Sequence, residues 1–389
     1  MAELQEMPSA ADVAAEDGER KVTSLELFFD LVFVFAITQV TAKMAAEPVW
    51  GGLVRGLLIV SLLWWAWVAY AWLTNTVDAD EGGTRILVFA AMGAMFVVAL
   101  AIPNAFGSDA LLFALAYGAV RLLHIVLYER GAHDEGVEAA VKRLAPGVLL
   151  AMGLLIAASQ FDGAVQGALW VAAVAVDYVG VVLAGTEGWK VSAGHFAERH
   201  GLIIIIALGE SIVAIGVGVS GLPLDAGLIG ASLLGLAVTC CLWWAYFDVV
   251  ALVAERKLRQ ATGRDRAALA RDSYSLLHLP MIAGIVLLAF GLKSTVGHVG
   301  GELAIVPAVA LGAGPALYLG AHVAFRYRNV HTVNRQRVAA ALLCLLVIPV
   351  ASTLPAIAGL GLLAVIWIGL IGYEAVRFRE ARARIRAAG

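Results

Sequence analysis

The feature that most constrains this chain is a series of twelve long apolar runs joined by short polar connections. A helix that crosses the hydrocarbon core of a bilayer needs roughly 20 residues of this kind. The runs lie near residues 25–44, 52–73, 85–103, 109–128, 146–160, 166–185, 200–219, 226–250, 273–292, 303–325, 337–352 and 357–376. Charged residues make up only 15% of the chain, against roughly 25% in soluble domains. The sequence predicts an all-α polytopic membrane protein of about twelve transmembrane helices in a lipid bilayer.

Charge and cysteine usage exclude several other classes. There are 27 basic and 30 acidic residues, and a net charge of −3 argues against a nucleic-acid partner. The acidic first residues lack an apolar core and a cleavage site, which excludes a secretory signal peptide. Cys240, Cys241 and Cys344 all fall inside apolar runs, so no disulfide framework is expected.

The distribution of Lys and Arg predicts the orientation in the membrane. With a cytoplasmic N-terminus, the cytoplasmic segments hold 23 of these residues and the other face holds only Lys43, Arg55 and Lys293. Cytoplasmic loops carry such an excess of positive charge. Twelve spans with both termini in the cytoplasm are therefore expected.

The two halves of the chain resemble each other. The second run contains Leu63-Trp64-Trp65-Ala66-Trp67 and the eighth contains Leu242-Trp243-Trp244-Ala245-Tyr246, while His124 and His322 end the fourth and tenth runs. Because each unit has an even number of spans, six, both units begin on the same side of the membrane. This is a parallel duplication of the kind found in transporters. We expect a cytoplasmic tail (1–22), two six-helix halves (23–190 and 191–376) and a basic cytoplasmic tail (377–389).

Ionisable residues inside the apolar runs are the strongest functional signal, because they are costly in hydrocarbon unless paired, hydrated or neutralised. Four of them, predicted to form a substrate or proton path, are Asp30, Arg121, Asp177 and Glu210. Together with Asp248, the interior acids outnumber the single interior arginine. Some carboxyls must therefore carry a proton, or a cation must accompany them.

The first run begins with Glu26 and Asp30, four residues apart and about 40° around a helix. Acids near a helix N-terminus also offset the helix dipole, behind a Ser24 cap. That structural interpretation explains Glu26 better than Asp30, which lies deeper in the run.

The seventh run places Glu210 near the middle of the membrane, after a polar start. Arg199 and Glu210 lie about 20° apart around a helix but roughly 16 Å apart along it. Both can face one cavity without touching. The alternative for Glu210 is a protonated carboxyl that hydrogen bonds to a neighbouring helix.

A polar cluster is predicted at the cytoplasmic end of the bundle, and its residues are Glu26, His124, His195, Glu198, Arg199 and His200. On one regular helix His195 and Glu198 lie about 60° apart, whereas His200 points about 160° away from Glu198. We therefore predict an interfacial polar cluster, with no metal and no cofactor. A metal site that draws on other helices is the alternative.

A buried Arg121 needs a carboxylate or an anionic ligand, since its guanidinium keeps its charge. Asp177, Asp30 and Glu210 are all candidate partners, and a purely structural ion pair is the alternative to a functional one. The aromatic residues at 64–72 and 243–247 are interpreted as packing and interface residues.

Three segments carry a family resemblance: Glu26-Leu27-Phe28-Phe29-Asp30, His195-Phe196-Ala197-Glu198-Arg199-His200-Gly201 and Ala207-Leu208-Gly209-Glu210-Ser211. With them, the chain resembles the bacterial low temperature requirement protein A family. The resemblance implies a multi-pass protein of the bacterial inner membrane, linked to growth in the cold. It implies no particular reaction or substrate.

Three interpretations of function remain at this stage. The first is a proton-coupled secondary transporter of an unidentified small solute, supported by the parallel halves and the surplus carboxyls. The second is a membrane-embedded enzyme that acts on a lipid or isoprenoid-like substrate through His and acidic residues. The third is a non-catalytic scaffold of the cold-adapted membrane. The oligomeric state is open.

Overall fold

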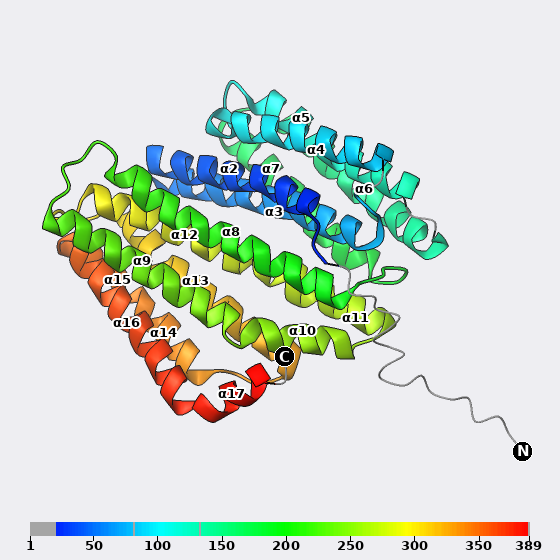
Figure 1. Ribbon diagram of the computed structural model, residues 1–389. Helices are drawn as coiled ribbons and strands as arrows, with labels where there is room; N and C mark the ends of the chain where they lie inside the picture. The colour runs from blue at the N-terminus through cyan, green and yellow to red at the C-terminus, as the bar shows by residue number, and fades with distance from the viewer. Residues whose placement is uncertain (1–20, 81, 132–133, 388–389) are drawn as a thin grey trace, which may run out of the picture.

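The computed structural model describes residues 21–80, 82–131 and 134–387 (Figure 1). Residues 1–20 of the predicted N-terminal tail and residues 388–389 of the predicted basic tail lie outside the described residues. The described residues form helices joined by short connections, and no strand occurs among them.

The first half supplies six spanning helices. They are α2 (Ser24–Ala46), α3 (Trp50–Thr76), α4 (Gly82–Ala101) with the 3₁₀ turn η1 (Ile102–Asn104), α5 (Ala110–Gly131), α6 (Glu135–Ala158) and α7 (Gly163–Ala184).

The second half is more divided. Its helices are α8 (Ala193–Val219), α9 (Ala226–Phe247), α10 (Val250–Gln260), α11 (Gly263–Leu269), the π-helix η2 (Ala270–Leu276), α12 (His278–Gly297), α13 (Ile305–Val330), α14 (Arg335–Leu345), α15 (Val347–Thr353), α16 (Ala356–Arg377) and α17 (Arg379–Ala387). The breaks after α9, η2 and α14 divide single spans into shorter helices and do not increase the number of spans. The described chain thus contains 12 helical segments long and apolar enough to cross a membrane.

The predicted number of spans and the all-α class are confirmed, but several boundaries differ. The fifth run was expected at 146–160, whereas α6 already begins at Glu135. The seventh was expected at 200–219, whereas α8 begins at Ala193. In both helices the first turns are polar, so a search for apolar residues misses them. The eleventh span is two helices, α14 and α15, which meet at Leu346.

The cap of α2 also differs from the expectation. Thr23, not Ser24, is the N-cap residue: its hydroxyl accepts from the Glu26 backbone N–H, and its own N–H donates to Glu26 Oε2 at 2.8 Å. This capping box requires an acid three residues after the cap, a spacing that Thr23 has and Ser24 lacks. Glu26 is thereby oriented at the very start of the helix.

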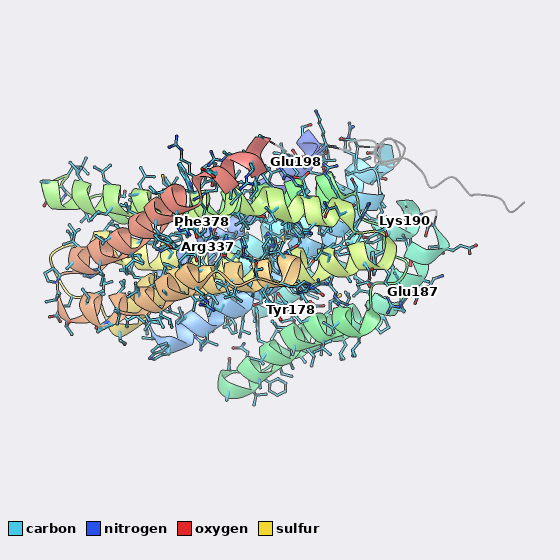
Figure 2. The ribbon with its side chains drawn as sticks, turned by 90° about the horizontal axis from the view of Figure 1, so that it is seen from below. Tyr178, Glu187, Lys190, Glu198, Arg337 and Phe378 are labelled. Atoms are coloured by element: carbon cyan, nitrogen blue, oxygen red, sulfur yellow. The ribbon has the colours of Figure 1, made fainter. Side chains whose placement is uncertain are left out.

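The helices are arranged around a central group made of α2, α3, α8 and α12. In Figure 1 helices α4, α5 and α6 lie on one side of this group, and α9 and α13 to α16 lie on the other. Helix α7 packs on α6 and on α3. The central helices α3 and α12 are the most buried, and α7 is the most exposed. Figure 2 shows Tyr178 on the side of α7 that faces the bundle, where its ring stacks on Trp65.

The order of helix packing is the same in both halves. In the first half α2 packs on α3 and α4, α4 on α5, α5 on α6, and α6 on α7. In the second half α8 packs on α9 and α12, α12 on α13, α13 on α14, and α15 on α16. This matching order supports the predicted duplication, which stays a prediction together with the cytoplasmic termini.

Helices α12 and α13 cross with their backbones in near contact. A Cβ atom on Gly284 would stand 2.6 Å from the Gly314 carbonyl oxygen, and one on Gly314 would stand 2.7 Å from the Gly284 oxygen. Small residues permit this approach between membrane helices. The close crossing packs α12, which begins at His278, tightly against α13.

Candidate functional site

The central site lies where α2 contacts α8, and we call Glu26, Asp30, His195 and Arg199 the interface cluster. Arg199 Nη2 donates to Asp30 Oδ1 at 3.0 Å, and its Nη1 lies 3.7 Å from Glu26 Oε1. All four side chains are buried. One guanidinium therefore faces two carboxyls from the neighbouring helix.

The state of His195 follows from its neighbours. The backbone N–H of Ser192 donates to Asn75 Oδ1 at 2.5 Å, which fixes the orientation of the Asn75 amide. Asn75 Nδ2 therefore donates to His195 Nδ1 at 3.1 Å. A ring nitrogen that accepts has no proton, so neutral His195 carries its proton on Nε2, 3.0 Å from Glu26 Oε1. His195 thus donates to Glu26.

Trp67 of α3 completes the surroundings of Asp30. Its indole Nε1–H donates to Asp30 Oδ1 at 2.9 Å, and its ring lies 5.6 Å from the Arg199 guanidinium carbon. Asp30 Oδ2 and the Arg199 atoms Nε and Nη1 have no hydrogen-bond partner in the described part of the chain. Buried polar atoms are rarely left without partners, so the cluster has capacity for another polar group.

A small cavity provides space for such a group. It has a volume of about 10 Å³ and is lined by Glu26, Tyr70, Thr74 and Arg199 among others. The Thr74 hydroxyl, like the Arg199 atoms, lacks a partner among the described residues. A cavity of this size has room for at most one water molecule.

A larger polar groove reaches the interface cluster from the end of the bundle where α2 begins. Its volume is about 520 Å³, and it is lined by His195, Glu198, Tyr246, Glu255, Arg259 and Tyr274 among others. The Tyr274 hydroxyl is buried and has no partner among the described residues. Small-molecule sites have volumes of about 300–1,000 Å³, so the groove is large enough for a solute.

The predicted cytoplasmic polar cluster is only partly assembled. Glu26, His195 and Arg199 contact one another, and Glu198 lines the groove. His200 lies on the other side of Trp67, 4.9 Å from its ring centroid. His124 packs against Tyr70, and neither of its ring nitrogens has a hydrogen-bond partner among the described residues.

His200 belongs to a second group of aromatic and imidazole rings. Its Nδ1 donates to the Phe196 carbonyl at 2.8 Å, and its ring lies 5.2 Å from that of His278. His278 Nδ1 donates to the Ser273 carbonyl of the π-helix, and its Nε2 accepts from the Tyr246 hydroxyl at 2.8 Å. Within residues 21–80, 82–131 and 134–387 no three His, Cys, Asp or Glu side chains are grouped so as to hold a metal ion.

Arg121 pairs with Asp177, which answers the question that sequence left open. Its Nη2 lies 3.5 Å from Asp177 Oδ1, and its Nη1 donates to the Trp65 carbonyl at 3.1 Å. The Tyr117 hydroxyl donates to Asp177 Oδ2 at 3.2 Å. Arg121 is therefore separate from Asp30 and Glu210, and the predicted path residues do not form one network.

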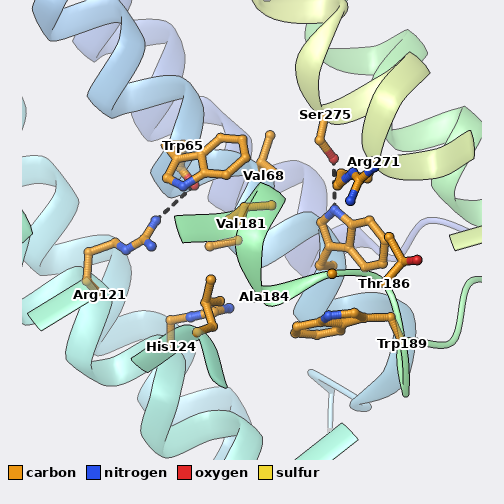
Figure 3. Close-up of a pocket in the computed structure, with 14 residues that line it drawn as sticks. Trp65, Val68, Arg121, His124, Val181, Ala184, Thr186, Trp189, Arg271 and Ser275 are labelled. Carbon is orange, nitrogen blue, oxygen red and sulfur yellow. Dashed lines mark hydrogen bonds between the residues drawn. The ribbon is translucent and has the colours of Figure 1, made fainter. Parts of the chain in front are cut away.

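Arg121 and His124 also line an apolar cavity of about 60 Å³ (Figure 3). Figure 3 shows Trp65 and Trp189 on two sides of this cavity, with Arg271 and Ser275 at its far end. Neither ring nitrogen of His124 has a hydrogen-bond partner in the described chain. The cavity has room for a few water molecules.

The sequence analysis did not predict the buried ion pair between Arg337 and Glu374. In the second half, Arg337 Nε and Nη2 donate to the two Glu374 oxygens, each at 2.9 Å, and Nη1 donates to His322 Nδ1 at 3.0 Å. Both residues stand near the ends of apolar runs, where charges are expected in water. The buried His322 was the available signal, because an interior histidine needs a partner.

Glu210 lies apart from every arginine described above. The Thr38 hydroxyl lies 2.5 Å from Glu210 Oε2 and 3.1 Å from the Val34 carbonyl. A hydroxyl has one proton to donate, and the carbonyl can only accept. Both contacts are satisfied together when Glu210 carries a proton and donates it to Thr38.

These features define a multi-pass helical membrane protein with ion pairs buried among its helices. The chain belongs to the family described as bacterial low temperature requirement A protein (LtrA), whose sequence pattern it matches over residues 21–372. It is similar to an uncharacterized protein of Rhizobium meliloti (strain 1021), with 29% identity over 293 residues, or 72% of this chain and 71% of the relative. No solved structure matches the chain. The family resemblance seen in the sequence is confirmed, and placement in the inner membrane stays a prediction.

Proposed function

We propose that the protein is a proton-coupled secondary transporter and that the interface cluster is its coupling site. One observation carries the proposal: two buried carboxyls, Glu26 and Asp30, share the single guanidinium of Arg199. The carboxyls belong to α2, the first helix of the first predicted half, and Arg199 belongs to α8, the first helix of the second. The shared pair therefore crosses the boundary between the halves.

Charge balance makes this cluster the natural place to take up a proton. With both carboxyls ionised and His195 neutral, its formal charge is −1. An uncompensated charge is unfavourable in a buried site, so the cluster favours one added proton or one bound cation. A proton on Asp30 would remove its attraction to Arg199 and weaken a contact that ties α8 to α2.

A secondary transporter works by moving two repeats around a central site, so that the site opens to each side in turn. Contacts between the repeats must then be strong in one state and weak in another. The Arg199–Asp30 pair has this property because one partner can be neutralised. Its distance of 3.0 Å corresponds to the closed contact.

Access from one side is supported by the polar groove. His195 lines that groove and donates to Glu26, so it stands between the groove and the buried carboxyls. With the predicted cytoplasmic termini, the groove would open to the cytoplasm.

The opposite direction is closed by apolar residues. Phe33, Ile37 and Ile203 line a cavity of only about 20 Å³ beyond the cluster. Further along α2, Glu210 meets Thr38, which stands about 12 Å from Asp30 on the helix. We assign Glu210 as a second protonatable group on the far side of this apolar segment.

The test is proton flux driven by a solute. The full chain would be reconstituted into liposomes that contain a pH-sensitive dye, and small cations, anions and neutral solutes would be added one at a time. We expect at least one solute to change the internal pH in the wild type and not in Asp30→Asn. The matched control is Glu187→Gln, an exposed acid in the loop between α7 and α8.

Two results would contradict the proposal. One is the absence of a pH response to any solute, as the enzyme and scaffold interpretations predict. The other is an unchanged response in Asp30→Asn, which would place the coupling group outside the interface cluster.

A further inference from the structure

The two predicted halves differ strongly in charge at the end of the bundle where α2 begins. In the first half, the connecting segments 78–85, 129–143 and 187–190 contain 8 acids and 5 Lys or Arg residues. In the second half, segments 248–272, 326–337 and 374–386 contain 6 acids and 15 Lys or Arg residues. A preference for positive cytoplasmic loops would act on both halves alike. The excess in the second half therefore calls for a separate cause.

Five of these 15 basic residues lie on α17 and at the end of α16. Arg382 and Arg386 both donate to the Asp248 carboxylate, which caps α9, and Arg256 of α10 donates to the Ile385 carbonyl oxygen. These contacts hold α17 against the junction of α9 and α10. The orientation of α17 is thereby fixed.

Three other arginines of this region are left exposed. Arg377, Arg379 and Arg384 form no ion pair with any other described residue, and each is exposed. The Arg377 guanidinium carbon lies 5.8 Å from the Phe378 ring centroid. A fixed helix thus presents a group of unpaired positive charges beside an aromatic side chain.

Apolar surface continues directly below these charges. Val376 is 81% exposed, and Tyr373 one turn earlier is half exposed. Trp243 and Trp244, at the end of the neighbouring α9, are 46% and 41% exposed. Aromatic residues at this level of a spanning helix mark the boundary between acyl chains and headgroups.

We infer that this end of the second half binds the headgroups of anionic phospholipids. Arg377, Arg379 and Arg384 would face the phosphates, and Tyr373 and Val376 would face the acyl chains. Basic residues at the edge of a membrane helix attract anionic lipids in this way. The site is independent of the proposed transport activity.

The test measures lipid retention by the purified full chain, using native mass spectrometry after titration with phosphatidylglycerol or phosphatidylcholine. We expect the wild type to retain phosphatidylglycerol in preference. In the triple variant Arg377→Gln/Arg379→Gln/Arg384→Gln we expect the affinity for phosphatidylglycerol to fall by at least about tenfold. Retention of phosphatidylcholine should be unchanged.

The matched control removes three exposed bases from the same end of the first half: Arg85→Gln/Arg130→Gln/Lys142→Gln. We expect this variant to keep the wild-type preference. Equal retention of the two lipids by the wild type, or an equal loss in the control variant, would overturn the inference. Complete displacement of the lipid by inorganic phosphate would overturn it as well, because it would show recognition of a free anion.

Discussion

Among the described residues, the buried arginines of the spanning helices are of two kinds. Arg121 and Arg337 each pair with one carboxylate from the same predicted half, Asp177 and Glu374, respectively. Arg199 instead joins the two predicted halves and faces two carboxylates. A matched pair within one half can only hold that half together. An unmatched group between the halves can exchange a proton, and we therefore place function at Arg199 and stability at the other two.

The largest effect is expected for Arg199→Leu. It removes the shared counter-charge of two buried carboxyls, and breaking one buried pair already costs about 3–5 kcal/mol. We expect little folded protein, measured as the monodisperse fraction in detergent. Adding Asp30→Asn should recover only part of it, because Glu26 remains. Full recovery by that second change would show that Glu26 does not depend on Arg199.

The next largest effect is expected for Arg121→Leu, which leaves one buried carboxylate without its partner. A loss of about 3–5 kcal/mol is expected, seen as a lower midpoint of thermal unfolding. Asp177→Asn should restore the midpoint in the double variant. Neither Asp30→Asn nor Glu210→Gln should do so, and rescue by either would contradict the pairing.

A sharper comparison uses the same substitution at two places. Asp177→Asn alone should destabilise the protein, because it leaves the Arg121 charge unpaired. Asp30→Asn should change the stability by less than about 1 kcal/mol, because it removes a surplus charge and its amide oxygen still accepts from Trp67. Thermal unfolding of the two variants side by side measures the difference. Equal losses of stability would mean that positive and negative charges are balanced in the interface cluster, as they are in the Arg121–Asp177 pair.

A smaller effect is expected for Glu210→Gln. The amide can donate to the Thr38 hydroxyl as a protonated carboxyl does, so the unfolding midpoint should stay close to that of the parent. Solute-driven proton flux should nevertheless be lost, because the amide cannot release a proton. Normal flux in this variant would leave Glu210 as a structural hydrogen-bonding group.

The smallest effect concerns an ion pair in water, outside the spanning helices. Asp134 caps α6 and accepts from Lys190 Nζ at 2.6 Å, and this hydrogen bond lowers the pKa of Asp134 below 3.8. The contribution to stability is therefore present above that value and is lost as the pH falls through the lowered pKa. The wild type should unfold slightly later than Lys190→Ala at about pH 6, and the difference should shrink as the pH falls through the lowered pKa. A difference that persists in acid would have another origin.

Sequence was sufficient for the all-α class and the number of spans, because hydrophobic length is a local property of the chain. It failed where burial is decided by neighbours. The first two turns of α8 are polar, yet His195 and Arg199 are buried because α2 and α3 supply partners. The position of Arg121 around its helix likewise could not identify Asp177 as its partner. That position shows which way the side chain points, but it does not show which helix lies opposite.

The Trp pairs of the two halves show the same limit. Trp64 and Trp65 are buried, whereas Trp243 and Trp244 are 46% and 41% exposed. The motif is shared, but α3 is central and α9 is peripheral. A repeated sequence motif therefore does not imply equal burial of the two helices that carry it.

The contact between Asp248 and α17 has a consequence for how the protein is made. Arg382 follows Asp248 by 134 residues and Arg386 follows it by 138. At a ribosome, the carboxylate at the end of α9 is therefore synthesised and inserted well before either of its partners exists. Until translation reaches α17, the nascent chain carries an uncompensated charge at this junction. A chain that stops before Arg382 lacks both of these partners of Asp248.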